Sequence, residues 1–195
     1  MRIIGLTGGI GMGKSTAANA FRRAGIPVFD ADAVVHALQA PGGKALRAIG
    51  AAFPGTVADG MLDRAALREA VIGKPQAFAR LEHIIHPLVR QEERSFVARA
   101  RRAGARAVVL DIPLLLETGG ENRVDHIVVV SAPRAVQVQR VRHRRRMDPA
   151  QIDSIIARQM PDAEKRRRAD TVVRTGLSRH HAQSTIRRLI RKLLA

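Results

Sequence analysis

One short stretch near the N-terminus constrains the fold of this chain more than any other: residues 7–16 read TGGIGMGKST. Gly8, Gly13, Lys14 and Ser15 have the spacing of a phosphate-binding P-loop. Glycine lets the backbone turn tightly and point successive N–H groups at one phosphate. An ordinary glycine-rich turn between a strand and a helix needs neither the lysine nor the serine. The motif therefore predicts a phosphate site.

The residues on either side of this loop predict the strand and the helix that a P-loop requires. Residues 2–6 form a short β-branched run, and residues 14–24 place apolar side chains on one helical stripe before Gly25, a natural helix stop. The helix N-terminus favours an anion, and Lys14 would neutralise the β- and γ-phosphates of a bound nucleotide. The Ser15 hydroxyl is suited to bind Mg²⁺.

Four further segments are typical of buried parallel strands, because each is short, β-branched and separated from the next by helical sequence. They are residues 27–30, 106–111, 126–131 and 171–175. Together with the first strand they predict an α/β fold of the P-loop NTPase type: three layers around a five-stranded parallel sheet.

Two stretches are longer than a crossover between parallel strands requires. Residues 32–103 show helical periodicity with almost no strand signal. We expect them to form a helical insertion that binds an acceptor substrate, in which Pro87 kinks the longest helix. Residues 140–168 predict a lid of two or three helices, with a turn at residues 148–149, whose arginines close over the transferring phosphoryl group. The expected nucleotide-binding core is the remainder: residues 1–31, 104–139 and 169–195.

The composition favours anionic partners, because 34 Lys and Arg against 17 Asp and Glu give a formal net charge of +17. Basic clusters at residues 140–146 and 164–170 make nucleic acid an alternative partner. However, the chain has no Tyr or Trp and only five Phe, so a surface for stacking bases is poorly supplied. We expect no nucleic-acid partner and keep a nucleic-acid-binding NTPase as the alternative.

The absence of cysteine fits a reducing compartment. The first residues, MRIIGLTGGIG, reach glycine too early for a signal peptide, and no apolar run approaches the length that spans a membrane. We expect a cytoplasmic protein with no membrane partner.

Carboxylates follow the second and third predicted strands, where the sheet also presents Lys14. Asp30 and Asp32 could cap the next helix, accept a proton or hold waters of Mg²⁺. Asp111 ends the third strand, which is the position of an acidic magnesium partner in many P-loop proteins. His86 has no second well-spaced histidine and carboxylate, so we do not expect it to bind a metal.

With these pieces in place, the chain resembles the dephospho-coenzyme A kinase family, which phosphorylates the ribose 3′-hydroxyl of dephospho-CoA in the last step of CoA biosynthesis. The matching stretches run in order along nearly the whole chain. They are GLTGGIGMGKST, GIPVFDADAVV, LDRAALREAV, HPLVR, VLDIPLLLE, VVVSAPRAVQVQR and a late AD-x-V. The resemblance implies ATP as phosphoryl donor and dephospho-CoA as acceptor. The residues Ser15 and Asp111 lead us to expect Mg²⁺ as well, and we expect a monomer or weak homo-oligomer.

The resemblance also assigns roles to individual residues. It implies that Asp32 is the base toward the 3′-hydroxyl, that Arg140 stabilises the transferring phosphoryl group with Lys14, and that Arg144 is the next lid arginine. The implied nucleotide contacts are Gly8, Gly11, Met12, Gly13, Lys14, Ser15, Thr16 and Arg144. The implied acceptor contacts are Thr7, Asp32, His86, Arg90, Pro113, Leu114 and Glu117. The implied metal ligands are Ser15 and Asp111.

The sequence departs from the family pattern at several positions. Met12 stands where serine is usual, Leu116 where phenylalanine is usual, and Arg145 where aspartate is usual. Arg174 and Thr175 replace a common Asp-Asn pair near the expected adenine pocket. We expect the Met12 side chain to point away from the phosphates. The P-loop itself does not select the acceptor, so another small-molecule or nucleotide P-loop kinase is also an open alternative.

Overall fold

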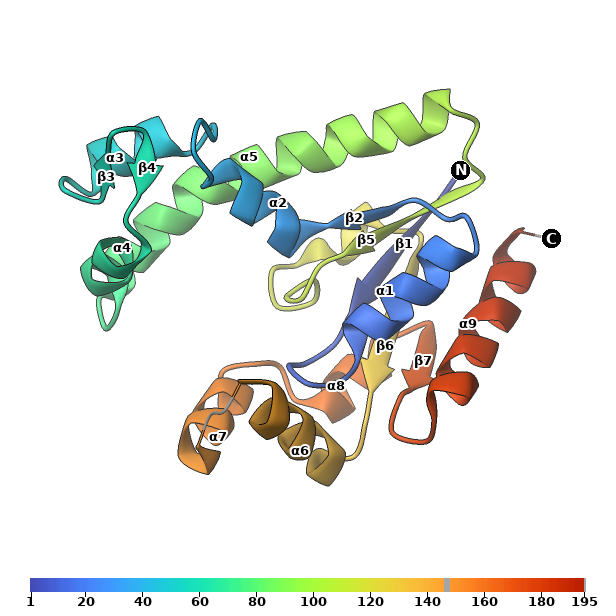
Figure 1. Ribbon diagram of the computed structural model, residues 1–195. Helices are drawn as coiled ribbons and strands as arrows, with labels where there is room; N and C mark the ends of the chain where they lie inside the picture. The colour runs from blue at the N-terminus through green and yellow to red at the C-terminus, as the bar shows by residue number, and fades with distance from the viewer. Residues whose placement is uncertain (146–147, 195) are drawn as a thin grey trace. The chain divides into compact units, whose positions relative to one another are not determined.

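The computed structural model describes residues 1–145 and 148–194 (Figure 1). Contacts between Cα atoms divide the chain into two compact units. The first comprises residues Met1–Phe29 and Arg99–Ala195, and the second comprises Asp30–Ala98.

A five-stranded parallel sheet organises the first unit, and its strand order is β2-β5-β1-β6-β7. The strands are β1 (Arg2–Thr7), β2 (Val28–Asp30), β5 (Ala107–Asp111), β6 (His126–Ser131) and β7 (Thr171–Arg174). All five predicted strands are confirmed. β1 lies between β5 and β6, so the chain leaves the carboxyl end of the central strand as the P-loop. This is the edge of an open α/β sheet at which ligands bind.

The core of the first unit lies between the sheet and two helices, α1 (Lys14–Arg23) and α9 (Arg179–Leu194). The helices contact each other, and Phe21 and Ile186 are fully buried against strand residues such as Leu6. On the opposite face of β1, a Cβ added to Gly5 would lie 2.6 Å from Leu115 Cδ2. The connection between β5 and β6 therefore packs closely over that face of the sheet, as a three-layer fold requires.

Three short helices follow β6, and we call them the lid helices. They are α6 (Arg134–Arg145), α7 (Pro149–Ala157) and α8 (Asp162–Arg167). A short 3-10 helix, η1 (Gly120–Arg123), precedes β6. Asp148 Oδ1 accepts a hydrogen bond of 2.9 Å from Gln151 N, so Asp148 caps α7 directly before Pro149. The turn predicted at residues 148–149 therefore coincides with the start of a helix, which Asp148 caps and Pro149 opens.

The second unit is mostly helical, as predicted for this part of the chain. Its helices are α2 (Ala31–Leu38), α3 (Leu46–Ala52), α4 (Arg64–Val71) and most of α5 (Pro75–Arg102). Ile49 and Phe53 are buried in its apolar cluster with Ile85 of α5. α5 is one continuous helix that includes Pro87. Phe78, which the periodicity predicts on the apolar stripe of α5 with Leu81, Ile85, Leu88 and Phe96, is 51% exposed, so the stripe begins after it.

The expectation of almost no strand in this unit missed a small hairpin. β3 (Val57–Ala58) pairs with the antiparallel strand β4 (Met61–Leu62). Asp59 and Gly60 between them have φ angles of 50° and 71°. Two positive φ values in a two-residue turn are typical of a tight hairpin, and Asp-Gly is a preferred sequence for it. The signal was present, but each strand is only two residues long.

Candidate active site

The P-loop follows β1 and requires its glycines for both conformation and space. Gly8, Gly11 and Gly13 have φ angles of 155°, 73° and 93°. A Cβ on Gly8 would lie 2.3 Å from a methyl group of Val130, and one on Gly11 would lie 2.8 Å from Gln137 O. Any side chain at these two positions would meet atoms of β6 or α6. The loop can therefore keep this shape only with glycine there.

Met12 lies in the same loop, but its side chain is buried in the core cluster of the first unit. Its sulfur accepts a hydrogen bond of 3.1 Å from Ala132 N. The prediction that Met12 points away from the phosphate side of the loop is confirmed. The family's usual serine is therefore replaced without placing a bulky side chain in the loop's interior.

Lys14 is the first residue of α1, and its ammonium group pairs with Asp111 at the end of β5. Lys14 Nζ lies 2.7 Å from Asp111 Oδ1, and the two side chains are 18% and 4% exposed. Burial strengthens such a pair relative to one in water. The pair holds a cation and a carboxylate at the carboxyl edge of the sheet, directly beside the P-loop.

The donor set at this edge fits a magnesium ion. Asp111 supplies a carboxylate, and Ser15 supplies an exposed hydroxyl in the first turn of α1. Mg²⁺ prefers oxygen ligands, keeps several waters and usually takes only one or two protein side chains together with substrate phosphates. Within residues 1–145 and 148–194, no three His, Asp or Glu side chains cluster as an all-protein metal site would need.

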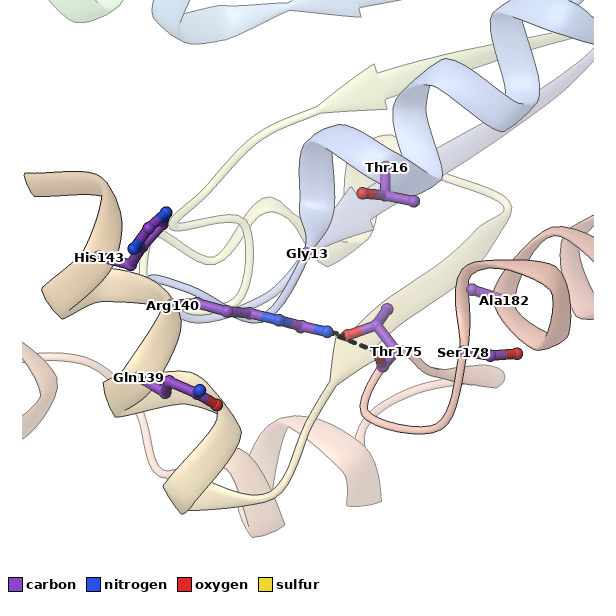
Figure 2. A pocket seen from close by; sticks show the side chains of 8 residues that line it. All are labelled: Gly13, Thr16, Gln139, Arg140, His143, Thr175, Ser178 and Ala182. Atoms are coloured by element: carbon purple, nitrogen blue, oxygen red, sulfur yellow. Dashed lines mark hydrogen bonds between the residues drawn. The ribbon is translucent and has the colours of Figure 1, made fainter.

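A pocket of about 490 Å³ opens next to the P-loop (Figure 2). Gly13 and Thr16 line one side of it, and side chains of α6 and of the segment after β7 line the other. Arg140 extends from α6 toward Thr175, where its Nη1 donates to Thr175 Oγ1 at 3.0 Å and its Nη2 to Thr175 O at 2.7 Å (Figure 2). Arg140 Nη1 also lies 3.4 Å from Gly11 O. The arginine therefore joins the P-loop to the end of β7.

Thr175, one of the departures from the family pattern, is buried at the centre of these contacts. Its hydroxyl donates to Met12 O while accepting from Arg140, and its N–H donates to Ser131 O at 2.8 Å. Thr175, which directly follows β7, thus connects the P-loop, α6 and the end of β6. Its neighbour Arg174 is exposed at the end of β7.

The predicted acceptor contacts in the first unit differ in their accessibility. Thr7 is fully buried, and its hydroxyl donates to Pro113 O at 2.9 Å. Leu114 is 41% exposed, whereas its neighbour Leu116 is buried. Glu117 Oε1 lies 2.6 Å from Lys165 Nζ and accepts a hydrogen bond of 3.2 Å from Met160 N. Thr7 and Glu117 therefore serve internal contacts, and Leu114 is the accessible member of the group.

The second unit carries Asp32 at the start of α2. The helix cap is Asp30, whose Oδ1 accepts a hydrogen bond of 3.0 Å from Ala33 N. Asp32 lies in the first turn and is exposed. Of the roles left open by the sequence, helix capping therefore describes Asp30, and Asp32 is exposed to solvent.

His86 and Arg90 line a separate open pocket of about 440 Å³ along α5. Two further basic residues, His83 and Arg94, share it with the carboxylate of Glu82. His86 Nε2 lies 3.9 Å from Glu82 Oε1 on the adjacent turn. The pocket presents several groups that can donate hydrogen bonds to an anion.

The side chain of Arg144, the second predicted lid arginine, lies outside the described residues. Two residues that the sequence did not single out contact the P-loop directly. The side chains of Gln137 and Gln159 bond to the backbone of Ile10. Gln137 belongs to the quoted stretch VVVSAPRAVQVQR, but only Arg140 of that stretch was given a role.

A P-loop after the central strand of a parallel sheet, a lysine paired with a strand-end carboxylate, and arginine-bearing lid helices define the class of P-loop kinases. Residues 2–180 match the family model described as dephospho-CoA kinase. The chain belongs to the dephospho-CoA kinase family.

Similar proteins agree with this assignment. The chain is 54% identical to a dephospho-CoA kinase of Gluconobacter oxydans, a match that covers 99% of this chain and 98% of that one. It is 52% identical to a dephospho-CoA kinase of Rhodopseudomonas palustris, over 100% and 94% of the two chains. The crystal structure of TT1252 from Thermus thermophilus matches with a TM-score of 0.87 and 34% identity, over 100% of this chain and 98% of that one. A dephospho-CoA kinase from Campylobacter jejuni shares the fold, with a TM-score of 0.67 and 21% identity over 99% and 97%.

Proposed function

We propose that this chain transfers the γ-phosphoryl group of ATP to the ribose 3′-hydroxyl of dephospho-CoA, giving CoA and ADP. One observation carries the proposal: the P-loop and the Lys14–Asp111 pair are intact in a chain that is more than half identical, over nearly its full length, to dephospho-CoA kinases. The family match supports the acceptor, and the loop geometry supports the donor.

On the donor side, the backbone N–H groups of the P-loop and the ammonium of Lys14 bind the β- and γ-phosphates. The pocket lined by Thr16 and Arg140 takes the rest of the nucleotide. Ser15 and Asp111 would hold Mg²⁺, which neutralises charge on the phosphates when it is bound. Arg140 adds positive charge near the phosphoryl group while the negative charge of that group is redistributed during transfer.

On the acceptor side, Asp32 accepts the proton of the 3′-hydroxyl. The 3′ oxygen then forms a bond to the γ-phosphorus while the bond from that phosphorus to the β,γ-bridging oxygen breaks, and the electron pair leaves with ADP. His86 and Arg90 of the basic pocket bind the anionic part of dephospho-CoA. The exposure of Asp32 supports this role, because a carboxylate that is used as a base has to reach substrate.

A coupled ADP-release assay tests the proposal. With ATP and Mg²⁺ present, dephospho-CoA should stimulate ADP formation strongly, whereas RNA and DNA should leave it at the background rate. Lys14→Ala is the matched control, since it should abolish the stimulated rate with the fold retained. Stimulation by a polynucleotide alone would instead support a nucleic-acid-binding NTPase. Stimulation by a different small acceptor alone would support another P-loop kinase.

We further propose that the protein acts in the cytoplasm as a monomer or weak homo-oligomer. Among the helices in the described part of the chain, none is long and apolar enough to cross a bilayer. Light scattering after size exclusion would measure the mass in solution. A stable assembly that persists on dilution would contradict the expected state.

A further inference from the structure

Two glutamine side chains hold one residue of the P-loop, Ile10, from opposite sides of its backbone. Gln159 Oε1 accepts a hydrogen bond of 3.0 Å from Ile10 N, and Gln137 Nε2 donates a hydrogen bond of 2.8 Å to Ile10 O. A backbone N–H can only donate and a carbonyl can only accept. The backbone therefore dictates which end of each amide faces it: the carbonyl oxygen of Gln159 and the NH₂ group of Gln137.

The two glutamines come from different parts of the lid segment. Gln137 lies on α6, and Gln159 lies between α7 and α8. Gln137 is 3% exposed, so its amide could not exchange this partner for water without cost. A Cβ on Gly9, the residue before Ile10, would lie 3.2 Å from Gln159 Oε1 and 3.4 Å from Gln137 Nε2. Gly9 thus leaves just enough room for both amides to reach the loop.

The next two carbonyls of the loop are also held by side chains. Arg140 approaches Gly11 O, and Thr175 donates to Met12 O. Three successive carbonyls, starting with that of Ile10, are thus bound by protein groups and cannot turn toward a bound phosphate. This arrangement keeps acceptor oxygens out of a site that has to present donors to an anion.

We propose that Gln137 and Gln159 are positioning residues that hold the P-loop in its phosphate-binding shape and tie it to the lid helices. Gln137 has the larger effect, because a carbonyl released from it is free to face the negatively charged phosphates. Gln159 fixes the same residue through its N–H. The proposal rests on the proposed function only in taking ATP as the ligand of the loop.

Two isosteric variants with the same change of charge test the proposal. Glu at position 159 still accepts from Ile10 N, whereas an ionised Glu at position 137 cannot donate to Ile10 O and places two oxygens against each other. We expect Gln137→Glu to weaken binding of a non-hydrolysable ATP analogue by about tenfold or more, and Gln159→Glu by less than about threefold. Gln151→Glu, at an exposed residue of α7, controls for added negative charge on the lid helices.

A titration of this defect separates positioning from general destabilisation. A buried carboxyl takes up a proton more readily than an exposed one, and a protonated Glu at position 137 regains a donor. The affinity of Gln137→Glu relative to the wild-type chain should therefore rise as the pH falls from about 8 to about 6. Binding of the analogue needs no acceptor, so an error in the assigned acceptor leaves this readout intact.

Equal loss of affinity in the two variants at positions 137 and 159 would overturn the proposal, as would wild-type affinity in both. If Gln137→Glu does not fold, Gln137→Met replaces it, because methionine fills the same space without a donor or a charge. Its affinity for the analogue should fall by at least threefold with an unchanged melting temperature. A fall in melting temperature with unchanged affinity would show a structural role alone.

Discussion

The ion pair between Glu117 and Lys165 makes the strongest prediction about stability. Lys165 of α8 is almost fully buried, with 2% of its side chain exposed, and Glu117 is 18% exposed. The second oxygen of the carboxylate, Glu117 Oε2, is buried and finds no hydrogen-bond partner among the described residues. Glu117 is therefore the group that compensates the buried ammonium of Lys165, while its Oε2 atom lacks a hydrogen bond within the described part of the chain.

We predict that Glu117→Gln costs more than Lys165→Met. Breaking a buried pair costs about 3–5 kcal/mol, and partial exposure of Glu117 favours the lower end, near 3 kcal/mol. For a chain of this length each kcal/mol lowers the melting temperature by about 2–4 °C, so we expect a fall of about 6–12 °C. Lys165→Met leaves a carboxylate that still reaches solvent and Met160 N, and we expect a loss of about 1–2 kcal/mol.

The double variant gives the sharper result. Because Lys165→Met removes the buried charge that Glu117→Gln leaves uncompensated, the double variant should be more stable than Glu117→Gln alone. Thermal and urea unfolding of the four proteins measure this cycle. A loss below about 1 kcal/mol in Glu117→Gln, or additive losses in the double variant, would refute the reasoning. If Glu117 binds the acceptor instead, Glu117→Gln should raise the KM for dephospho-CoA without lowering the melting temperature.

Four further predictions concern the site and the response to pH. Lys14→Ala and Ser15→Ala should each lower kcat by about a hundredfold or more with the fold retained, since they remove a phosphate counter-charge and a magnesium ligand; Lys14→Ala should also lower the melting temperature, because it leaves the buried Asp111 carboxylate without its ammonium partner, and near wild-type turnover in this variant would mean that the loop is not the donor site. Arg140→Lys should lower kcat much more than ATP affinity, because an ammonium cannot bridge two oxygens as a guanidinium does, and equal losses measured by steady-state kinetics and calorimetry would make Arg140 a ground-state contact. Asp32→Asn should lower turnover by about two to four orders of magnitude with little change in melting temperature, and retention of more than about half the wild-type rate would remove Asp32 as the base. Burial lowers the pKa of His126; nearby Lys192 and Arg2 act in the same direction, and Asp170 opposes them. Stability that is present above the unfolded-state pKa of about 6.5 is therefore lost as the pH falls through the pKa of the folded state. Urea unfolding at about pH 7.5 and at about pH 5 measures how much unfolding free energy is lost between the two pH values. This loss should be smaller for His126→Gln, whose amide can still bond Thr171, than for the wild-type chain.

The sequence predicted those features that depend on neighbouring residues. The five strands are β-branched runs, and the P-loop is a local motif, so both could be located without knowing the packing. The turn at residues 148–149 is equally local, although the sequence did not show that Asp148 caps the helix that follows. The hairpin around Asp59 and Gly60 was also signalled locally, but its strands were too short to stand out.

The remaining features depend on residues far apart in the chain. Periodicity put Phe78 on the apolar stripe of α5, but only the packing of the second unit shows that it is exposed. The contact between Gln159 and Ile10 joins residues 149 positions apart, and the charges of Glu117 and Lys165 are separated by 47 intervening residues. Glu117 was assigned to the acceptor because its motif resembles that of the family. The buried lysine beside it has no sequence pattern that would reveal it.

The acceptor position is tested most directly by comparing dephospho-CoA with its 3′-deoxyribose analogue. The analogue retains the charge and nearly all of the shape of the substrate but lacks the oxygen that we propose to attack phosphorus. We predict ADP formation and a product phosphorylated at the 3′ position with dephospho-CoA. With the analogue we predict no ADP above the acceptor-free rate, and the analogue should still inhibit competitively. Equal ADP formation with the two compounds, or a phosphoryl group found at another position, would contradict it.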